Sequence, residues 1–225
     1  MGRKRDAEFW SGKGIAKATI HKNGLDVNVY NIHLLSRLSI NSNESVDYNS
    51  VDRLSELFEV FTQVVEQRDS DAFILLGDFN MNLYNKEFDF FRNLTGLKGS
   101  LFQLNNSSAC TYCLGNTFNS KNEGQLDYIW ISPRLKFNTM EIFMDKTYVV
   151  DGTPTNLSDH YGVKANVGIN HIVPYQQSNS LMKENTLKEI KYLKDVLLKD
   201  LAGKEPFPKV DRNKGAAENL FRSCR

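Results

Sequence analysis

The residues best suited to chemistry in this sequence begin at Asp78, directly after an unbroken apolar run. Residues 72–76 read Ala-Phe-Ile-Leu-Leu, lie between Asp71 and Gly77, and predict a strand buried on both faces. Asp78 and Asn80 follow it, and side chains two residues apart on an extended chain point the same way. One carboxylate and one carboxamide should therefore face a common site at the end of a strand, where α/β folds place their chemistry. Taken alone, these residue types are more typical of a turn.

Three further apolar stretches carry a histidine or an acid. They are 27–34 with His33 near its end, 126–131 with Asp127 inside it, and 161–167, which Ser158, Asp159 and His160 precede. A histidine with a pKa near neutrality can take a proton from water when an acid fixes its tautomer, and carboxylates are the hard oxygen ligands that Mg²⁺ prefers. Considered separately, His33 is more typical of a half-buried imidazole and Asp127 of a strand-edge acid.

A helix must connect the strand that carries His33 to the strand that precedes Asp78. Ser50 is expected to cap this helix. Apolar residues recur about every 3.6 residues over 51–65, with Arg53 turned outward, which predicts a helix packed on a sheet. A β-α-β crossover of this kind is right-handed by default, and it should bring His33 and Asp78 to one edge.

The remaining elements are predicted from local composition and from the positions of turn-forming residues. They are strands over 16–21 and 25–34 joined by a turn at Asn23-Gly24, a short helix over 86–94, a loop over 96–124, strands over 126–132 and 140–150, and a turn over 152–155. The order strand, helix, strand, strand, strand is typical of half of a layered α/β sandwich.

The ordered motifs carry a resemblance to a known superfamily. Strand-His-Leu at His33, Gly-Asp-Phe-Asn at 77–80, Leu-Asp-Tyr-Ile at 126–129 and Ser-Asp-His at 158–160 resemble the endonuclease/exonuclease/phosphatase superfamily. That resemblance implies an α/β fold of the four-layer α+β sandwich type, flanked by helices, of which this chain carries the C-terminal half.

Within that superfamily, the sequence is most similar to the neutral sphingomyelinases over about residues 9 to 170. The similarity rests on Gly152-Thr153-Pro154 ahead of Leu157-Ser158-Asp159-His160, on the loop 113–118, and on the helix around residues 52–54. It implies a Mg²⁺-dependent phosphodiesterase of the phospholipase C type. Such an enzyme cleaves sphingomyelin to ceramide and phosphocholine, so its expected partner is a phospholipid substrate at a membrane surface.

The resemblance also implies a role for each candidate residue. His160 is expected to be the general base, Asp127 the acid that orients it, and Asp159 a residue on the metal side. Asp78 and Asn80 are expected to position the water and the phosphate. His33 would donate to the phosphoryl oxygens or the leaving group, and Lys13 would touch the substrate. In this scheme, Mg²⁺ neutralises the charge on the phosphate.

The sequence departs from the family pattern at its start. Family members begin with a strand that ends in a metal-ligand Glu, and no such strand precedes Phe9. The chain is therefore interpreted as a partial catalytic domain over residues 1–170, with low activity alone. Residues 171–225 are interpreted as a lysine-rich tail with one docking helix, partly disordered.

Composition limits the class of protein. The 225 residues are 40% hydrophobic and 11% aromatic, enough for one packed domain, and the net charge of +1 does not favour a nucleic-acid partner. No signal peptide or membrane span is evident, which predicts an intracellular protein, cytoplasmic or peripherally membrane-associated. Cys110 and Cys113 have the spacing of zinc ligands but lack a second pair, so they are expected to be ordinary thiols in a loop.

Two other functions remain open on the sequence. One is a nuclease or an inositol-phosphate phosphatase of the same superfamily. The other is a non-catalytic fragment that binds lipid or regulates a partner, for which the basic tail provides a membrane-seeking surface.

Overall fold

The structure is a computed structural model that describes residues 13–22, 24–37, 47, 49–66, 70–83, 85–99, 110–120 and 123–170. The predicted tail over residues 171–225 lies outside these described residues. None of the helices within them is long and apolar enough to cross a membrane.

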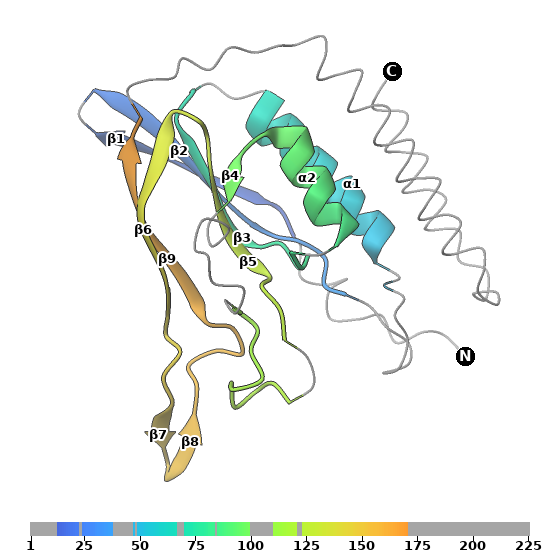
Figure 1. Cartoon of the computed structure of the whole chain (residues 1–225), viewed down its shortest axis with the longest axis vertical. Coiled ribbons are helices and arrows are strands. Elements are labelled where there is room, and N and C mark those ends of the chain that lie inside the picture. Colours follow the sequence, from blue (N-terminus) through green and yellow to red (C-terminus); the bar gives the residue numbers. More distant parts are fainter. Residues whose placement is uncertain are drawn as a thin grey trace, which may run out of the picture.

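A five-stranded sheet forms the centre of the molecule (Figure 1). Its strands are β1 (Ile15–Lys22), β2 (Leu25–His33), β3 (Phe73–Asp78), β4 (Lys98–Gly99) and β5 (Asp127–Ile131), in the spatial order β1-β2-β3-β5-β4. The predicted hairpin between β1 and β2 is confirmed, and Gly24 turns it with a φ of 75°. β1 is exposed along its whole length, as an edge strand is expected to be. The short strand β4 falls in a region that was expected to be loop.

The register of the central strands places three candidate residues in one row. β2 and β3 are parallel, as predicted for a β-α-β unit, and pair His33 with Asp78. β3 and β5 are antiparallel and pair Asp78 with Asp127. The expectation that the crossover brings His33 and Asp78 to one edge is therefore confirmed.

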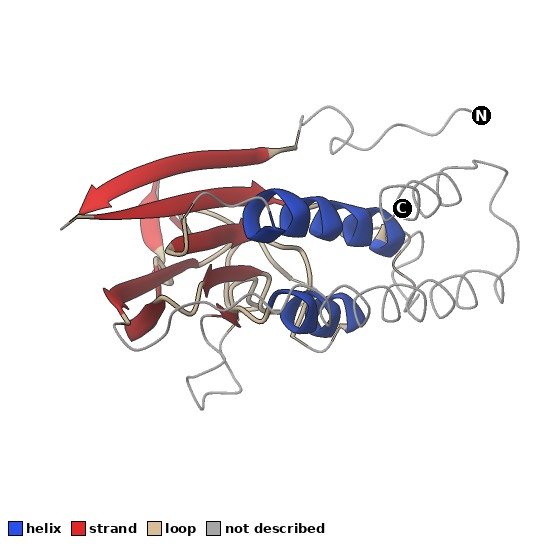
Figure 2. Cartoon of the chain, turned by 90° about the horizontal axis from the view of Figure 1, so that it is seen from above, coloured by secondary structure: helices blue, strands red, loops and turns tan. Residues whose placement is uncertain are grey.

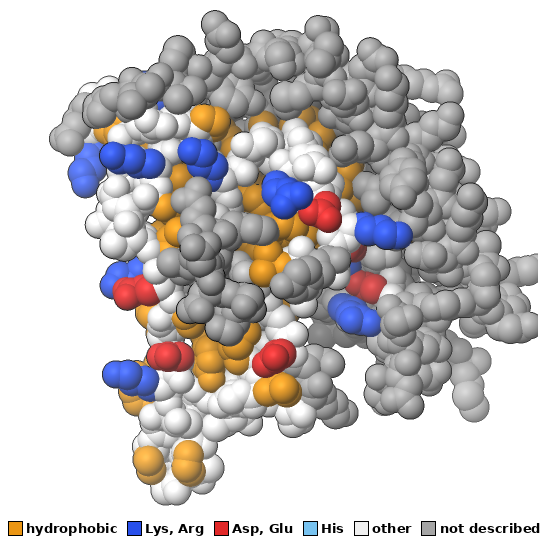
Figure 3. All heavy atoms as spheres, viewed as in Figure 1, with side chains coloured by type: hydrophobic (Ala, Val, Ile, Leu, Met, Phe, Trp, Pro, Cys, Tyr) orange, Lys and Arg blue, Asp and Glu red, His pale blue; other side chains and the backbone are white. Residues whose placement is uncertain are grey.

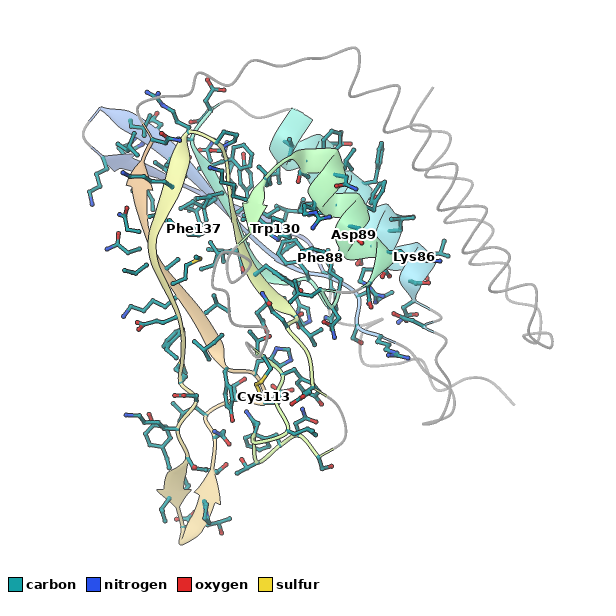
Figure 4. All side chains as sticks on the ribbon, viewed as in Figure 1. Lys86, Phe88, Asp89, Cys113, Trp130 and Phe137 are labelled. Atoms are coloured by element: carbon teal, nitrogen blue, oxygen red, sulfur yellow. A yellow bond between two sulfur atoms is a disulfide. The ribbon has the colours of Figure 1, made fainter. Side chains whose placement is uncertain are left out.

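Two helices cover one face of this sheet (Figures 1 and 2). They are α1 (Ser50–Val60), which continues as a π-helix over Phe61–Glu66, and α2 (Lys86–Thr95). Between the helices and the sheet lies an apolar cluster rich in aromatic rings, in which Phe88 of α2 lies 5.5 Å from Trp130 of β5, centroid to centroid (Figure 4). Burial of such large rings is the main contribution of this layer to stability.

Arg53 is a correction to the helix prediction. Its side chain was expected to face outward, yet it is fully buried. The guanidinium bonds to the carboxylates of Asp47 and Glu87 and donates to the Leu35 carbonyl at 3.0 Å. The protein tolerates this buried charge because two carboxylates and a carbonyl oxygen accept hydrogen bonds from the guanidinium. The N-cap is Asn49 rather than Ser50, and no side chain caps the helix.

The opposite face of the sheet meets a second, two-stranded sheet. β6 (Leu135–Phe143) pairs with β9 (Gly162–Ile169), and Phe137 and Val167 from these strands pack against the same cluster as Ile74 of β3. β3 is therefore buried on its helix side at Phe73 and Leu75 and only half-buried at Ile74 and Leu76. The prediction of burial on both faces is right for one face and too strong for the other. Helices, central sheet and second sheet make the layered α/β sandwich that the sequence predicts.

A long hairpin leaves the second sheet between β6 and β9. Its strands are β7 (Tyr148–Val150) and β8 (Thr153–Thr155), and Asp151 and Gly152 turn it with positive φ angles of 49° and 77°. Figure 1 shows the hairpin extending away from the helices and the central sheet. The single strand expected over 140–150 is therefore divided between β6 and β7. The expected turn over 152–155 is wrong in extent, because the turn is at Asp151 and Gly152 and residues 153–155 form β8.

We expect Gly77→Ala to destabilise the protein by about 3 kcal/mol. A Cβ at Gly77 would lie 1.9 Å from the backbone oxygen of Ile32, and φ is 135°. Gly96→Ala is the matched control, because its φ is also positive, at 61°, but no atom lies within 4 Å of the added Cβ. It should cost about 1 kcal/mol. Urea unfolding of the two variants measures both values, and equal losses would contradict the steric argument.

Candidate active site

His33, Asp78 and Asp127 stand side by side at the end of the central sheet because their strands are in register. The Nε2 atom of His33 lies 3.5 Å from Oδ2 of Asp78. The His33 side chain is 59% exposed, whereas the Asp78 side chain is only 17% exposed. The row therefore presents an accessible imidazole next to a sheltered carboxylate.

Asn80 joins this row through a turn and not through an extended strand. It has a φ of 50°, and its backbone N–H donates to Oδ1 of Asp78 at 2.8 Å. Its side-chain amide donates to Oδ2 of Asp78 at 3.2 Å and to the Leu34 carbonyl at 2.9 Å. Asn tolerates the left-handed region better than most residues. The sequence left open whether Asn80 forms a turn or faces the same place as Asp78, and in the structure it does both.

His160 reaches the row from the segment that connects β8 to β9. Its Nδ1 lies 2.7 Å from Oδ2 of Asp127, and both side chains are about three-quarters buried, at 23% and 22% exposure. The hydrogen bond to Asp127 raises the pKa of His160. A carboxylate on Nδ1 leaves Nε2 as the nitrogen that can take or give a proton.

Two carboxylates share this end of the sheet. Burial and the neighbouring charge of Asp127 raise the pKa of Asp78 to about 6. One ligand atom from each of Asp78, Asp127 and His160 lies within 4.8 Å of the others. Mg²⁺ binds hard oxygen donors that carry excess negative charge. The raised pKa of Asp78 means that its ionised form is disfavoured, and a bound cation would favour that form. The donor set therefore fits a divalent cation at Asp78 and Asp127.

Asp159 and Lys13 stand at the margin of this arrangement. Asp159 is exposed, accepts a hydrogen bond from Ser158 Oγ at 3.3 Å, and is outside the group of three ligand-bearing residues. Its charge still contributes to the raised pKa of His160. The Lys13 ammonium donates to the Leu34 carbonyl at 2.6 Å, the same oxygen that accepts from Asn80.

Cys110 and Cys113 correct the sequence interpretation, because they form a disulfide and are not free thiols. Their Cα atoms are 5.5 Å apart, which is within the range a disulfide spans. Figure 4 shows Cys113 in the loop that precedes β5 in the chain. The two residues that this disulfide encloses, Thr111 and Tyr112, contact the backbone and side chains of the site. The sequence analysis used Cys110 and Cys113 only for their spacing and residues 113–118 only for a resemblance, so nothing in it pointed to Thr111 or Tyr112.

Glu56 is a third residue near the site that the sequence did not single out. Its carboxylate accepts the backbone N–H of Leu35 at 2.7 Å, two residues beyond His33. Burial raises the pKa of Glu56. Because Leu35 also bonds to Arg53, helix α1 fixes the chain where it leaves the site.

The fold is shared with solved structures of the endonuclease/exonuclease/phosphatase type. A beta toxin from Staphylococcus aureus aligns with a TM-score of 0.51 and 23% identity, over 68% of this chain and 57% of that chain. TDP2 from D. rerio, complexed with a single-strand DNA product, aligns with a TM-score of 0.54 and 18% identity, over 69% and 62%. An endonuclease/exonuclease/phosphatase family protein from Bacteroides thetaiotaomicron aligns with a TM-score of 0.50 and 20% identity, over 66% and 52%.

The chain spans between about half and three-fifths of the length of these structures. The sequence matches no protein-family model, and no curated protein matches it. At these identities the likeness establishes the fold alone, and the chemistry is inferred from the geometry of the site.

We expect Asp78→Asn to stabilise the protein at pH 8 in the absence of Mg²⁺, by about 1–3 kcal/mol. The pKa of Asp78 is raised from 3.8 to about 6, so the folded state keeps this proton to a higher pH than the unfolded state. Wild-type stability should therefore fall as pH rises through this window, and the gap between variant and wild type should open there and close below pH 4.

Urea unfolding between pH 3.5 and pH 8 measures this gap. Asp89→Asn, at an exposed position of α2, is the control and should show almost no gap. Adding Mg²⁺ should stabilise the wild type more than Asp78→Asn. A variant that is less stable than wild type at pH 8 would contradict the burial argument.

Proposed function

We propose that this protein is a Mg²⁺-dependent phosphodiesterase of the phospholipase C type, which hydrolyses sphingomyelin to ceramide and phosphocholine. The observation that carries the proposal is the 2.7 Å contact between His160 Nδ1 and Asp127 Oδ2, adjacent to Asp78 and His33 at one end of the sheet. An oriented base, an anionic metal-binding pair and an accessible imidazole are the parts that phosphodiester hydrolysis needs.

His160 is the base in this proposal. Asp127 fixes the tautomer, so that Nε2 of His160 takes a proton from the attacking water. The water oxygen bonds to phosphorus, the bond between phosphorus and the ceramide oxygen breaks, and that oxygen leaves as a hydroxyl once protonated. His33, 59% exposed and next to Asp78, is placed to donate to a phosphoryl oxygen or to the leaving oxygen.

In this proposal, a bound Mg²⁺ and Lys13 balance the negative charge on the phosphate. Asp78 and Asp127 would hold Mg²⁺, with Asp159 nearby on the solvent side, and the bound ion would neutralise the phosphoryl oxygens. Asn80 positions the water and the phosphate from its turn. Lys13 would add positive charge beside Leu34, whose carbonyl it shares with Asn80.

The hairpin β7–β8 supports a lipid substrate. Val149 is 73% exposed and Val150 52% exposed, and Figure 3 shows hydrophobic side chains at the far end of the hairpin. Leu157 and Phe118, at the base of the hairpin, are also more than half exposed. Apolar side chains on a projecting element are suited to the interfacial region of a membrane, and the hairpin leads directly to Ser158 and His160.

A nuclease is the second candidate, because TDP2, which shares the fold, is complexed with single-strand DNA. The net charge of +1 does not favour it, since proteins that bind the phosphate backbone usually carry a basic footprint.

We expect the chain to release phosphocholine from sphingomyelin vesicles in Mg²⁺, and His160→Ala to lower that rate by about 10²–10⁴-fold because the base is lost. His21→Ala is the matched control. His21 also contacts an aspartate, Asp26, at 2.5 Å, but on exposed strand ends outside the site. Its removal should leave the rate unchanged.

A plasmid-nicking assay on the same samples separates the alternatives. Nicking that depends on His160, without phosphocholine release, would identify a nuclease. Silence in both assays with retained vesicle binding would identify a non-catalytic lipid-binding module and overturn the proposal.

We expect Val149→Glu to lower hydrolysis of sphingomyelin in vesicles by about tenfold, because a charge replaces an apolar contact with the membrane. Hydrolysis of a soluble phosphodiester, bis(p-nitrophenyl) phosphate, should stay unchanged. Ile20→Glu on the exposed strand β1 is the control, since Ile20 is half exposed and β1 belongs to a different sheet. Equal losses on both substrates would contradict a membrane role for the hairpin.

A further inference from the structure

A small disulfide loop beside the site contains a fully buried threonine that the proposed reaction does not use. Cys110 and Cys113 close the loop, and Thr111 inside it has no exposed surface. A polar side chain in such a place must satisfy its hydrogen bonds within the protein. The partners of Thr111 therefore show what the loop holds in place.

On one side, Thr111 holds the start of β5. Its Oγ1 accepts the backbone N–H of Leu126 at 2.9 Å and the backbone N–H of Asp127 at 3.1 Å. Its own backbone N–H donates to the Gly124 carbonyl at 3.0 Å. The hydroxyl thus satisfies two backbone N–H groups at the start of β5, one of which belongs to Asp127, the partner of His160.

On the other side, the same loop holds the segment that carries His160. The carbonyl of Thr111 accepts the backbone N–H of Tyr161 at 2.7 Å. The ring of Tyr112 lies 5.1 Å from the His160 ring, centroid to centroid. Thr111 is therefore bonded to Asp127 and to the neighbour of His160 at the same time.

The segment that follows Cys113 strengthens this connection. Asn116 is buried and donates from its side chain to the Ser158 carbonyl at 2.8 Å. The backbone N–H of Thr117 donates to Asn156 Oδ1 at 2.8 Å, and the backbone N–H of Asn156 donates to Thr117 Oγ1 at 2.9 Å. The turn before β9 is thus bound, at Asn156 and Ser158, to the segment that directly follows the disulfide.

We propose that Thr111 is the positioning residue for the Asp127–His160 pair, and that the Cys110–Cys113 disulfide keeps it in place, so that the activity of the site depends on the oxidised state of the loop. This proposal rests on the proposed function for its activity readout. The family resemblance, which rests in part on residues 113–118, assigns no role to Thr111 or to the disulfide, and neither do the similar solved structures.

The redox step is a thiol–disulfide exchange. A dithiol reductant attacks the S–S bond and supplies two electrons and two protons. Cys110 and Cys113 become thiols, and the reductant becomes a disulfide. Reduction removes the only covalent closure of the loop among the described residues, while the apolar core between the helices and the sheet is untouched.

Substitution at Thr111 tests the positioning role. Thr111→Val removes the acceptor of two backbone N–H groups and should lower kcat by about 10²-fold with little change in KM, because it displaces the pair and leaves the substrate surface intact. Thr111→Ser keeps the hydroxyl and should retain activity within about threefold of wild type. Thr95→Val is the matched control, because Thr95 is also a buried threonine, but its hydroxyl bonds to Phe91 within α2 and to the backbone N–H of Leu97, away from the site.

Reduction tests the disulfide. A dithiol should lower kcat of the wild type, re-oxidation should restore it, and the Cys110→Ser/Cys113→Ser double variant should be slow and insensitive to the reductant. Thr111→Val with wild-type kcat, or full activity after complete reduction measured by thiol titration, would overturn the proposal.

A second readout does not depend on activity. The Nδ1 proton of His160, held by Asp127, should give a low-field ¹H NMR signal that His160→Ala removes. Thr111→Val and reduction should weaken or shift this signal, and Thr95→Val should not. Wild-type protein without hydrolytic activity but with these NMR changes would reject the proposed function and uphold the positioning role. A signal that reduction and Thr111→Val both leave unchanged would reject the positioning role itself.

Discussion

The register of three strands is the constraint on which the site depends. Parallel pairing of β2 with β3 and antiparallel pairing of β3 with β5 set His33, Asp78 and Asp127 in one row across the sheet. Slipping any strand by one residue would turn its polar group to the other face and break the row. Gly77 secures that register, because only a residue without a Cβ lets β3 lie against the Ile32 carbonyl. Backbone pairing thus determines the site, and side chains outside the sheet complete it.

Placing two carboxylates in that row has an electrostatic cost. Asp78 is sheltered and lies next to Asp127, and these two causes raise its pKa to about 6. The cost is offset in part by His160 and His33 and by the backbone N–H of Asn80, each of which lowers the pKa of Asp78. A bound cation would offset the remaining imbalance. In the proposed function, stability and activity therefore oppose each other at Asp78, as is common where pKa values are shifted at functional sites.

The local patterns in the sequence predicted the parts of the site that depend on one element and its neighbour. The apolar run before Asp78, the helix over 51–65 and the crossover rule were enough to bring His33 and Asp78 together. The burial of Arg53 was missed because its partners, Asp47 and Glu87, come from separate segments that no periodicity connects. The disulfide was missed because Cys-x-x-Cys spacing alone does not fix the distance between two Cα atoms. Thr111 carries no motif, and only the tertiary contacts show what it holds.

His160 and the exposed hairpin belong to one continuous segment. From Phe143 the chain runs out along β7, returns along β8, and reaches His160 only a few residues later. Asn156 at the foot of the hairpin bonds to Thr117, and Ser158 bonds to Asn116, so the same loop supports both the hairpin and His160. Hydrogen bonds between side chains and backbone therefore hold the foot of the hairpin and the residues next to His160 to the same segment. In the proposed function, a membrane that contacts Val149 would therefore lie on the side of the molecule from which the chain leads back to the Asp127–His160 pair.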